Sequence, residues 1–103
     1  MMVNRAKISS KLKIILSEQD ISCGLDIIRI LIDDSENKKR QEEYQGMRGE
    51  MLEQGVMRVN QSVSRDYFYS ILEALTNNGI IIAKDKDRKQ ENRHYIVGAS
   101  YRD

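Results

Sequence analysis

Residues 63–97 hold the strongest fold signal in this chain: a capped amphipathic helix, a glycine stop and two apolar segments separated by a charged stretch. Ser64 offers a side-chain oxygen for the helix start, and Gly79 permits the left-handed conformation that ends a helix. Four apolar residues recur at helical spacing and predict one buried stripe: Phe68, Ile71, Leu72 and Leu75. Two short apolar segments then predict the strands of a hairpin, Ile80–Ala83 and Arg93–Val97.

The remainder of the chain predicts further helices. Apolar residues at helical spacing indicate a first helix over residues 4–18 and a second over 20–33, with Asp20 or Ser22 as its N-cap. The charged segment from Ser35 to Glu43 either loops out or begins a solvated helix. Helical periodicity returns at Tyr44 and Met47, and we expect a third helix to include part of residues 48–60. Its inward residues are expected to be Met51, Leu52 and Met57.

Length and composition favour a single small domain. The 103 residues suffice for one modest core, and no apolar run approaches the roughly 20 residues that span a bilayer. Cys23 is the only cysteine and His94 the only histidine, which excludes an intrachain disulfide and argues against histidine-based metal or triad chemistry. We expect a cytoplasmic protein without a metal or cofactor, with Cys23 buried and His94 structural.

The net charge of +1 says little, but the charge distribution is informative. Residues 1–16 hold four bases and no acid. The nine polar residues Lys84 to Asn92, with Arg93 after them, form a second basic cluster that also contains acids. Asp33, Asp34 and Glu36 lie close in sequence, but no second cluster with ligand spacing supports a metal site. A local basic footprint matters more for nucleic-acid binding than the total charge.

The segment from Val63 onward resembles the winged helix-turn-helix superfamily of DNA-binding proteins. The resemblance rests on Val63-Ser64 at the turn, the apolar positions of the helix, Asn78-Gly79-Ile80-Ile81 after it, and a wing ending in Tyr95-Ile96-Val97. It covers about half of the chain. Gln61 departs from the pattern, since the family usually has an apolar residue there. The resemblance implies a mainly α fold with a small β-hairpin wing, in which residues 48–97 form the helix-turn-helix plus wing within a single domain over 1–103.

In that family the recognition helix, here residues 64–77, lies in the major groove with its first half near the base edges. Arg65 is then a candidate for bidentate pairing with guanine, while Ser62 and Tyr67 are candidates for phosphate contacts. The competing interpretation is that Arg65 is a solvated helix charge and Tyr67 a rim aromatic. The residues that the resemblance nominates in this part are Ser62, Ser64, Arg65, Asp66, Tyr67, Tyr69 and Ser70.

The wing, residues 84–93, supplies the second set of candidates. Its cations are suited to phosphates or to the minor groove. An ordinary solvated hairpin tip is the alternative, and Asp85, Asp87 and Glu91 weaken the basic character. The nominated residues are Lys86, Arg88, Lys89 and Arg93.

These observations favour a non-enzymatic protein that binds double-stranded DNA as a homodimer, with the helices of residues 1–34 as dimerisation surfaces. A transcriptional regulator is the leading role. The alternative is a plasmid or phage partition adaptor, similar to TubR-type centromere-binding proteins, that binds repeated sites and recruits a filament-forming nucleotidase. A second alternative is a winged-helix protein-interaction module whose basic tip binds an acidic partner.

Overall fold

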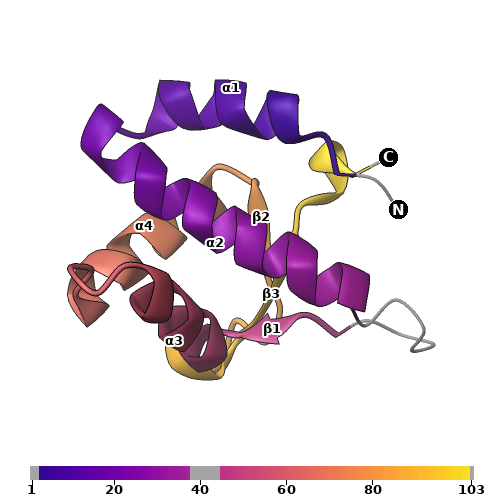
Figure 1. The fold of residues 1–103 in the computed structure, drawn as a ribbon. Coiled ribbons are helices and arrows are strands. Elements are labelled where there is room, and N and C mark those ends of the chain that lie inside the picture. The colour runs from indigo at the N-terminus through magenta and orange to yellow at the C-terminus, as the bar shows by residue number, and fades with distance from the viewer. Residues whose placement is uncertain (1–2, 38–44, 103) are drawn as a thin grey trace.

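The computed structural model describes residues 3–37 and 45–102, which form four α-helices and a three-stranded antiparallel sheet (Figure 1). The first two helices lie antiparallel to one another, and the longer of them, α2, crosses the middle of the molecule. It packs against each of the other helices and against the last strand. The helices are α1 (Arg5–Ile15), α2 (Glu18–Asn37), α3 (Gly49–Val59) and α4 (Arg65–Asn77).

The sheet has the order β1-β3-β2, so the last strand lies in the middle. Both expected hairpin strands are present, each one residue shorter than predicted, as β2 (Ile81–Ala83) and β3 (His94–Val97). Burial alternates along β3, because Tyr95 and Val97 are buried while His94 and Ile96 are half-buried. The third strand, β1 (Met47–Arg48), was not predicted; it pairs Met47 with Tyr95.

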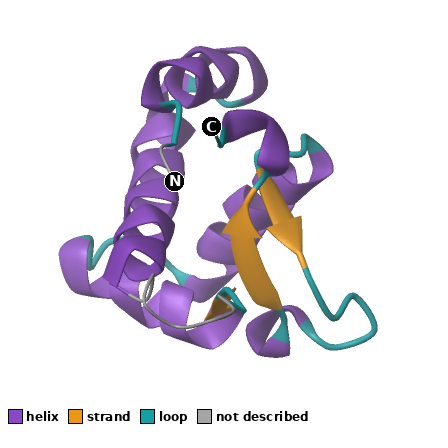
Figure 2. Cartoon of the chain, turned by 90° about the vertical axis from the view of Figure 1, so that its right-hand side faces the viewer, coloured by secondary structure: helices purple, strands orange, loops and turns teal. Residues whose placement is uncertain are grey.

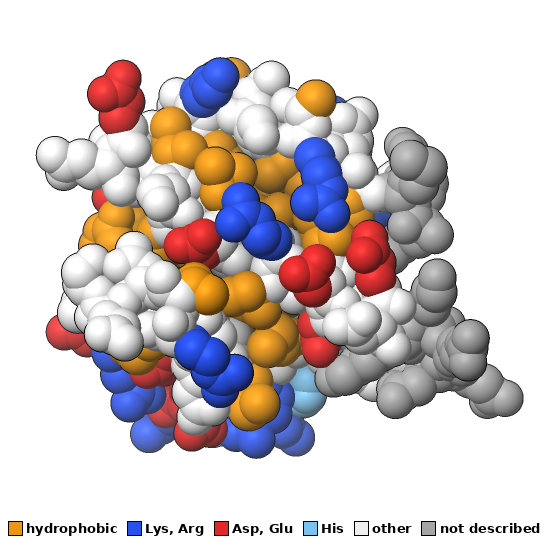
Figure 3. Space-filling model, viewed as in Figure 1, with side chains coloured by type: hydrophobic (Ala, Val, Ile, Leu, Met, Phe, Trp, Pro, Cys, Tyr) orange, Lys and Arg blue, Asp and Glu red, His pale blue; other side chains and the backbone are white. Residues whose placement is uncertain are grey.

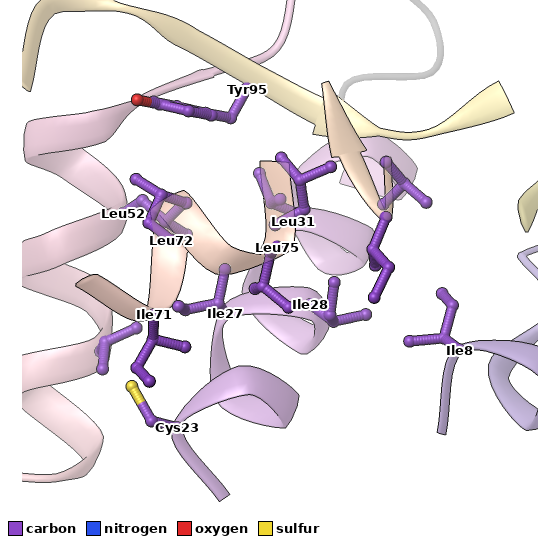
Figure 4. Packing of buried hydrophobic residues seen from close by; sticks show 14 of the residues in the cluster. Ile8, Cys23, Ile27, Ile28, Leu31, Leu52, Ile71, Leu72, Leu75 and Tyr95 are labelled. Carbon is purple, nitrogen blue, oxygen red and sulfur yellow. The ribbon is translucent and has the colours of Figure 1, made fainter. Parts of the chain in front are cut away.

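The hydrophobic core forms where α2, α3, α4 and the sheet meet (Figure 4). Leu31 of α2, Leu52 of α3 and Leu72 of α4 are each at most 1% exposed. Tyr95 of β3 closes one side of this cluster. Cys23 is buried as expected, in the same cluster. Helical faces that are distant in sequence therefore share one apolar core.

The helix predicted over residues 64–77 is confirmed in detail. Ser64 is its N-cap, and its Oγ accepts a hydrogen bond of 3.2 Å from the Tyr67 backbone N–H. All four residues of the predicted stripe are buried. Gly79 follows with a φ of +73°, a left-handed conformation that other L-residues rarely adopt. The cap, the stripe and the stop all depend on neighbours within about one helical turn, which explains why sequence periodicity located them.

The predicted bounds of the second helix were wrong. It begins at Glu18 rather than at Asp20 or Ser22, and it continues beyond Asp33 to Asn37. Acids near a helix C-terminus cost only about 0.3–1 kcal/mol each. Packing of the preceding turn into the core outweighs that cost. Ser35 also remains compatible with the helix, because its hydroxyl donates to the Ile32 carbonyl at 2.8 Å.

The predicted inward face of the third helix was partly wrong. Leu52 is buried as expected, but Met51 is 50% exposed and Met57 is only half-buried, while Val56 takes the second core position. The methionine spacing led to this error, since Met47 belongs to β1 and not to the helix. Of the segment Ser35–Glu43, expected either to loop out or to begin a solvated helix, residues 35–37 end α2. Its remaining residues and Tyr44 lie outside the described part of the chain.

The two ends of the described chain lie beside each other (Figure 1). The Asn4 backbone N–H donates to the Tyr101 carbonyl at 2.8 Å, and Val3 forms a β-bridge with Arg102. Tyr101 lies in the short helical turn η2 (Ala99–Tyr101) and is 7% exposed. The Lys7 ammonium lies 5.3 Å from the centre of its ring. These contacts fix α1 to the C-terminal end of the hairpin.

Candidate nucleic-acid interface

The turn between α3 and α4 is held by its own side chains. The Oδ1 of Asn60 accepts hydrogen bonds from the backbone N–H of Ser62 at 3.2 Å and from its hydroxyl at 2.6 Å. Val63 anchors the turn in the core at 6% exposure, and Gln61 is exposed. The predicted phosphate contact Ser62 thus lies on the surface, but its hydroxyl proton is already committed within the turn.

Arg65 lies at the first position of α4 and contacts three elements. Its Nε is 3.7 Å from a carboxylate oxygen of Glu53 in α3, and one of its terminal nitrogens is 3.8 Å from Glu91. Glu91 belongs to η1 (Gln90–Asn92), a short helical turn before β3. The guanidinium also lies 5.6 Å from the ring centre of Tyr69. Because the Arg65 side chain remains 58% exposed and both ion pairs are long, these contacts are weak.

The two nominated tyrosines point toward the protein rather than outward. The Tyr67 hydroxyl donates to the Asp20 carboxylate of α2 at 2.5 Å. That hydrogen bond is the main reason that the pKa of Tyr67 is raised to about 12. The Tyr69 hydroxyl is buried, and burial, together with the neighbouring Glu53 carboxylate, raises its pKa further. Both rings therefore connect α4 to neighbouring helices.

The Tyr67–Asp20 hydrogen bond predicts a pH dependence of stability. A pKa raised on folding means that the folded state binds the phenolic proton more tightly, so the stabilisation is complete below pH 10 and disappears as the pH rises toward 12. Tyr67→Phe should be less stable than the wild type at neutral pH. Urea unfolding should show the difference in unfolding free energy shrinking between pH 10 and pH 12; a difference that stays constant across this interval would contradict the assignment.

The outward face of α4 is not basic. Asp66, Ser70, Glu73 and Asn77 are all exposed and recur at intervals of four, three and four residues, which places them on one face. Asp66 and Ser70 were nominated as candidates near the base edges. Two carboxylates on this face repel phosphates, so any attraction to a nucleic-acid backbone must come from another element.

The loop of residues 84–93, which extends from the two hairpin strands in Figure 2, supplies that positive charge through its lysines and arginines. Lys86, Arg88 and Lys89 are all exposed. Arg93 has a different place: its Nε donates to the Arg88 carbonyl at 2.7 Å and a terminal nitrogen donates to the Lys86 carbonyl at 3.0 Å. Three of the four nominated loop cations thus face solvent, and the fourth holds the loop backbone.

The base of the loop is fixed by polar contacts and close packing. His94 Nδ1 lies 3.0 Å from a carboxylate oxygen of Asp85, whose φ of +56° places it in the left-handed region. The Tyr95 hydroxyl donates to the Gln90 carbonyl at 3.3 Å. That carbonyl also packs so closely against Gly49, the first residue of α3, that a Cβ there would collide with it. The loop is therefore attached to α3 as well as to the hairpin.

Arg48 is a residue of this surface that sequence reasoning missed. One terminal nitrogen donates to the Glu50 carboxylate at 3.0 Å and to the Asn92 side-chain oxygen at 3.3 Å. The pairing of β1 with β3 brings it there, opposite His94. A strand of two residues that pairs with a distant segment has no local sequence pattern. Sequence reasoning therefore could not identify Arg48 as a residue of this surface.

The described part of the chain gives little support for a metal site, a reactive cysteine or a membrane-spanning helix. Within residues 3–37 and 45–102, the acidic, cysteine and histidine side chains form no group of three suited to a metal ion. Burial is the main cause that raises the pKa of the Cys23 thiol to about 11, which disfavours the reactive thiolate. None of the helices built from these residues has both the length and the apolar content for crossing a bilayer.

The surface made by the turn, α4 and the loop is thus a mixed one. The start of α4 meets the loop at Glu91, Lys86 lies near the C-terminal end of α4 with Thr76 and Asn77, and the outward face of the helix is acidic. Comparison with known proteins adds no relative, since no family model, no curated protein and no solved structure matches the chain.

Proposed function

We propose that this protein is a winged helix-turn-helix that binds double-stranded DNA. The order α2, β1, α3, α4, β2, loop, β3 and the sheet order β1-β3-β2 support this fold. The observation that carries the function is the contact between Arg65 and Glu91, which joins the start of α4 to the η1 end of a loop that carries three exposed cations. A helix end and a basic loop on one side of the molecule can engage a groove and the adjacent backbone together.

In this proposal the two parts have different tasks. Lys86, Arg88 and Lys89 contact phosphates and supply most of the affinity. Arg65 contacts the edge of a guanine base. To do so, it gives up its ion pairs with Glu53 and Glu91. Losing these ion pairs costs little free energy, because exposed ion pairs of 3.7 and 3.8 Å contribute little to stability. Tyr67 and Tyr69 hold the helix in position rather than contacting DNA.

The first test is the binding of labelled duplexes, taken from a random pool by selection, measured by fluorescence anisotropy over a range of salt concentrations. Affinity should fall steeply with salt. Arg65→Ala should weaken binding to the selected duplex by about 1–3 kcal/mol and relax its sequence preference. Lys13→Ala is the matched control, because it removes one exposed positive charge from α1, away from this surface. A wild-type protein that retains no duplex at low salt would refute the proposal.

A protein-interaction module is the second candidate, and one observation favours it. The outward face of α4 carries Asp66 and Glu73, which suit a partner with basic groups better than a phosphate backbone. Such a module would show no salt-sensitive binding of duplex DNA, and Arg65→Ala would leave its charge-driven contacts largely unchanged.

Two roles fit a DNA-binding protein of this kind, and both are proposals. A cytoplasmic transcriptional regulator would protect a single operator, whereas a partition adaptor would occupy an array of repeats and recruit a filament-forming nucleotidase. Footprinting on the protein's own upstream region separates them: one protected site supports regulation, and several regularly spaced sites support partition.

A further inference from the structure

A small cavity of about 270 Å³ lies between α1 and α2, and none of its lining residues belongs to α4 or to the loop of residues 84–93. Figure 3 shows hydrophobic side chains exposed between these two helices, with basic side chains beside them. We call it the α1–α2 cavity. It is lined by Arg5, Ile8 and Ser9 of α1 and by Leu25, Ile28, Arg29 and Ile32 of α2.

The apolar part of the lining is fixed in place by the core. Ile8, Ile28 and Ile32 are only 1%, 4% and 1% exposed, because they also pack into the hydrophobic core. Leu25 is half-buried against the same core and adds an apolar side to the cavity. A ligand would therefore meet a preformed apolar surface, and few protein side chains would have to become ordered when it binds.

The polar part of the lining is positive. Arg5 and Arg29 come from different helices, both are exposed, and no acidic residue lines the α1–α2 cavity. Arg5 forms no side-chain hydrogen bond or ion pair with the described part of the chain. Arg29 is 63% exposed and has only a long ion pair of 3.8 Å with Asp26. Two guanidinium groups with spare bonding capacity beside an apolar surface suit an amphipathic anion.

The adjoining cavity on α2 has a different charge. It has a volume of about 420 Å³ and shares Leu25 and Arg29 with the α1–α2 cavity, but Glu18 and Asp26 line it as well. These carboxylates repel an anion. Asp33 lies one turn after Arg29 and is exposed, but it lines neither cavity. An anion is therefore attracted to the end where Arg5 and Arg29 both line the space.

We propose that the α1–α2 cavity binds a small apolar carboxylate, such as a medium-chain fatty acid. The carboxylate lies between Arg5 and Arg29, which offer the paired N–H donors that match its two oxygens. The hydroxyl of Ser9, one turn after Arg5 on the same face of α1, is a further donor. The hydrocarbon chain lies along Leu25 and Ile28. This inference does not depend on the proposed DNA binding, because the two surfaces share no residue.

The test is a titration of isotope-labelled protein with octanoate, followed through the backbone amide shifts in NMR spectra. A ligand with about ten non-hydrogen atoms is expected to bind with a Kd of roughly 0.1–10 mM. The shifts should saturate and should be largest around Ser9 and Ile28. Octan-1-ol and octylamine keep the chain but lack the negative charge, so each should bind roughly 10-fold more weakly.

Two variants test the arginines. Arg5→Gln and Arg29→Gln each remove one charge and keep a polar side chain, so each should weaken octanoate binding roughly 3- to 10-fold. Lys13→Gln is the matched control, since it removes an exposed charge of α1 outside the cavity and should bind octanoate as the wild type does. Both arginines are exposed, so circular dichroism should show an unchanged fold.

The proposal fails if the shifts rise linearly with octanoate, if octan-1-ol binds the wild type as tightly, or if the arginine variants bind as the wild type does. Equal weakening by Lys13→Gln would also overturn it, because binding would then follow net charge alone. The comparison of the three ligands uses the wild type, so it holds even if a variant fails to fold. No DNA enters the measurement, and a negative result leaves the proposed DNA binding untouched.

Discussion

Replacing Phe68 by alanine is expected to cost about 3–5 kcal/mol of unfolding free energy, as for other buried phenylalanines. Phe68 is fully buried, and its ring meets the Tyr69 ring edge-on with the centres 4.8 Å apart. Its removal leaves a cavity under α4 that the neighbouring side chains fill only in part. Domains of this size are stable by about 5–15 kcal/mol, so the variant should be close to unfolding at physiological temperature.

Urea unfolding followed by circular dichroism measures this loss. Glu73→Ala is the matched control, because Glu73 lies on the outward face of the same helix and its truncation should change stability by no more than about 0.5 kcal/mol. Equal stability of the two variants would show that α4 does not pack on the core through the stripe that begins at Phe68.

The second large effect is expected from the loop. Replacing Arg88 and Lys89 together by glutamine should weaken binding to any duplex roughly 10- to 100-fold at about 0.1 M salt. The slope of log affinity against log salt should become shallower by about 1.8, which corresponds to two lost phosphate contacts. Sequence preference should stay the same, because phosphate contacts carry no sequence information.

A double variant of α1, Lys11→Gln with Lys13→Gln, removes the same charge from a different face. It should leave the salt slope unchanged, so that a loss in both double variants would indicate a response to net charge alone. The backbone of the loop is held by Arg93, which neither double variant touches. A changed salt slope in the loop variant therefore reports on its two side chains rather than on a collapsed loop.

Sequence reasoning succeeded where structure depends on near neighbours. The N-cap at Ser64, the buried stripe beginning at Phe68 and the left-handed Gly79 all follow from interactions within a few residues. The alternation of β3 likewise follows from the period of two in a half-buried strand. These features lie on one segment, and that segment carried the whole resemblance.

Sequence reasoning failed where an element depends on contacts with residues distant in sequence. The strand β1 exists because Met47 and Arg48 pair with β3, and the outward place of Met51 follows from the way α3 packs on α2 and on the base of the loop. The candidate site shows the same division. Exposure of Lys86, Arg88 and Lys89 agreed with their charged sequence, whereas the folded path of the loop directs Arg93 to the carbonyls of Lys86 and Arg88.

The sequence by itself determined that residues 63–97 form a helix, a stop and a hairpin, because caps, periodicity and glycine act over one or two turns of chain. Only the tertiary structure decided which side chains of that segment remain available. Tyr67 bonds Asp20, and Arg65 lies between Glu53 and Glu91, because α2, α3 and the loop converge on α4. Those partners come from elements up to 47 residues away in sequence, and their approach depends on the packing of a shared core.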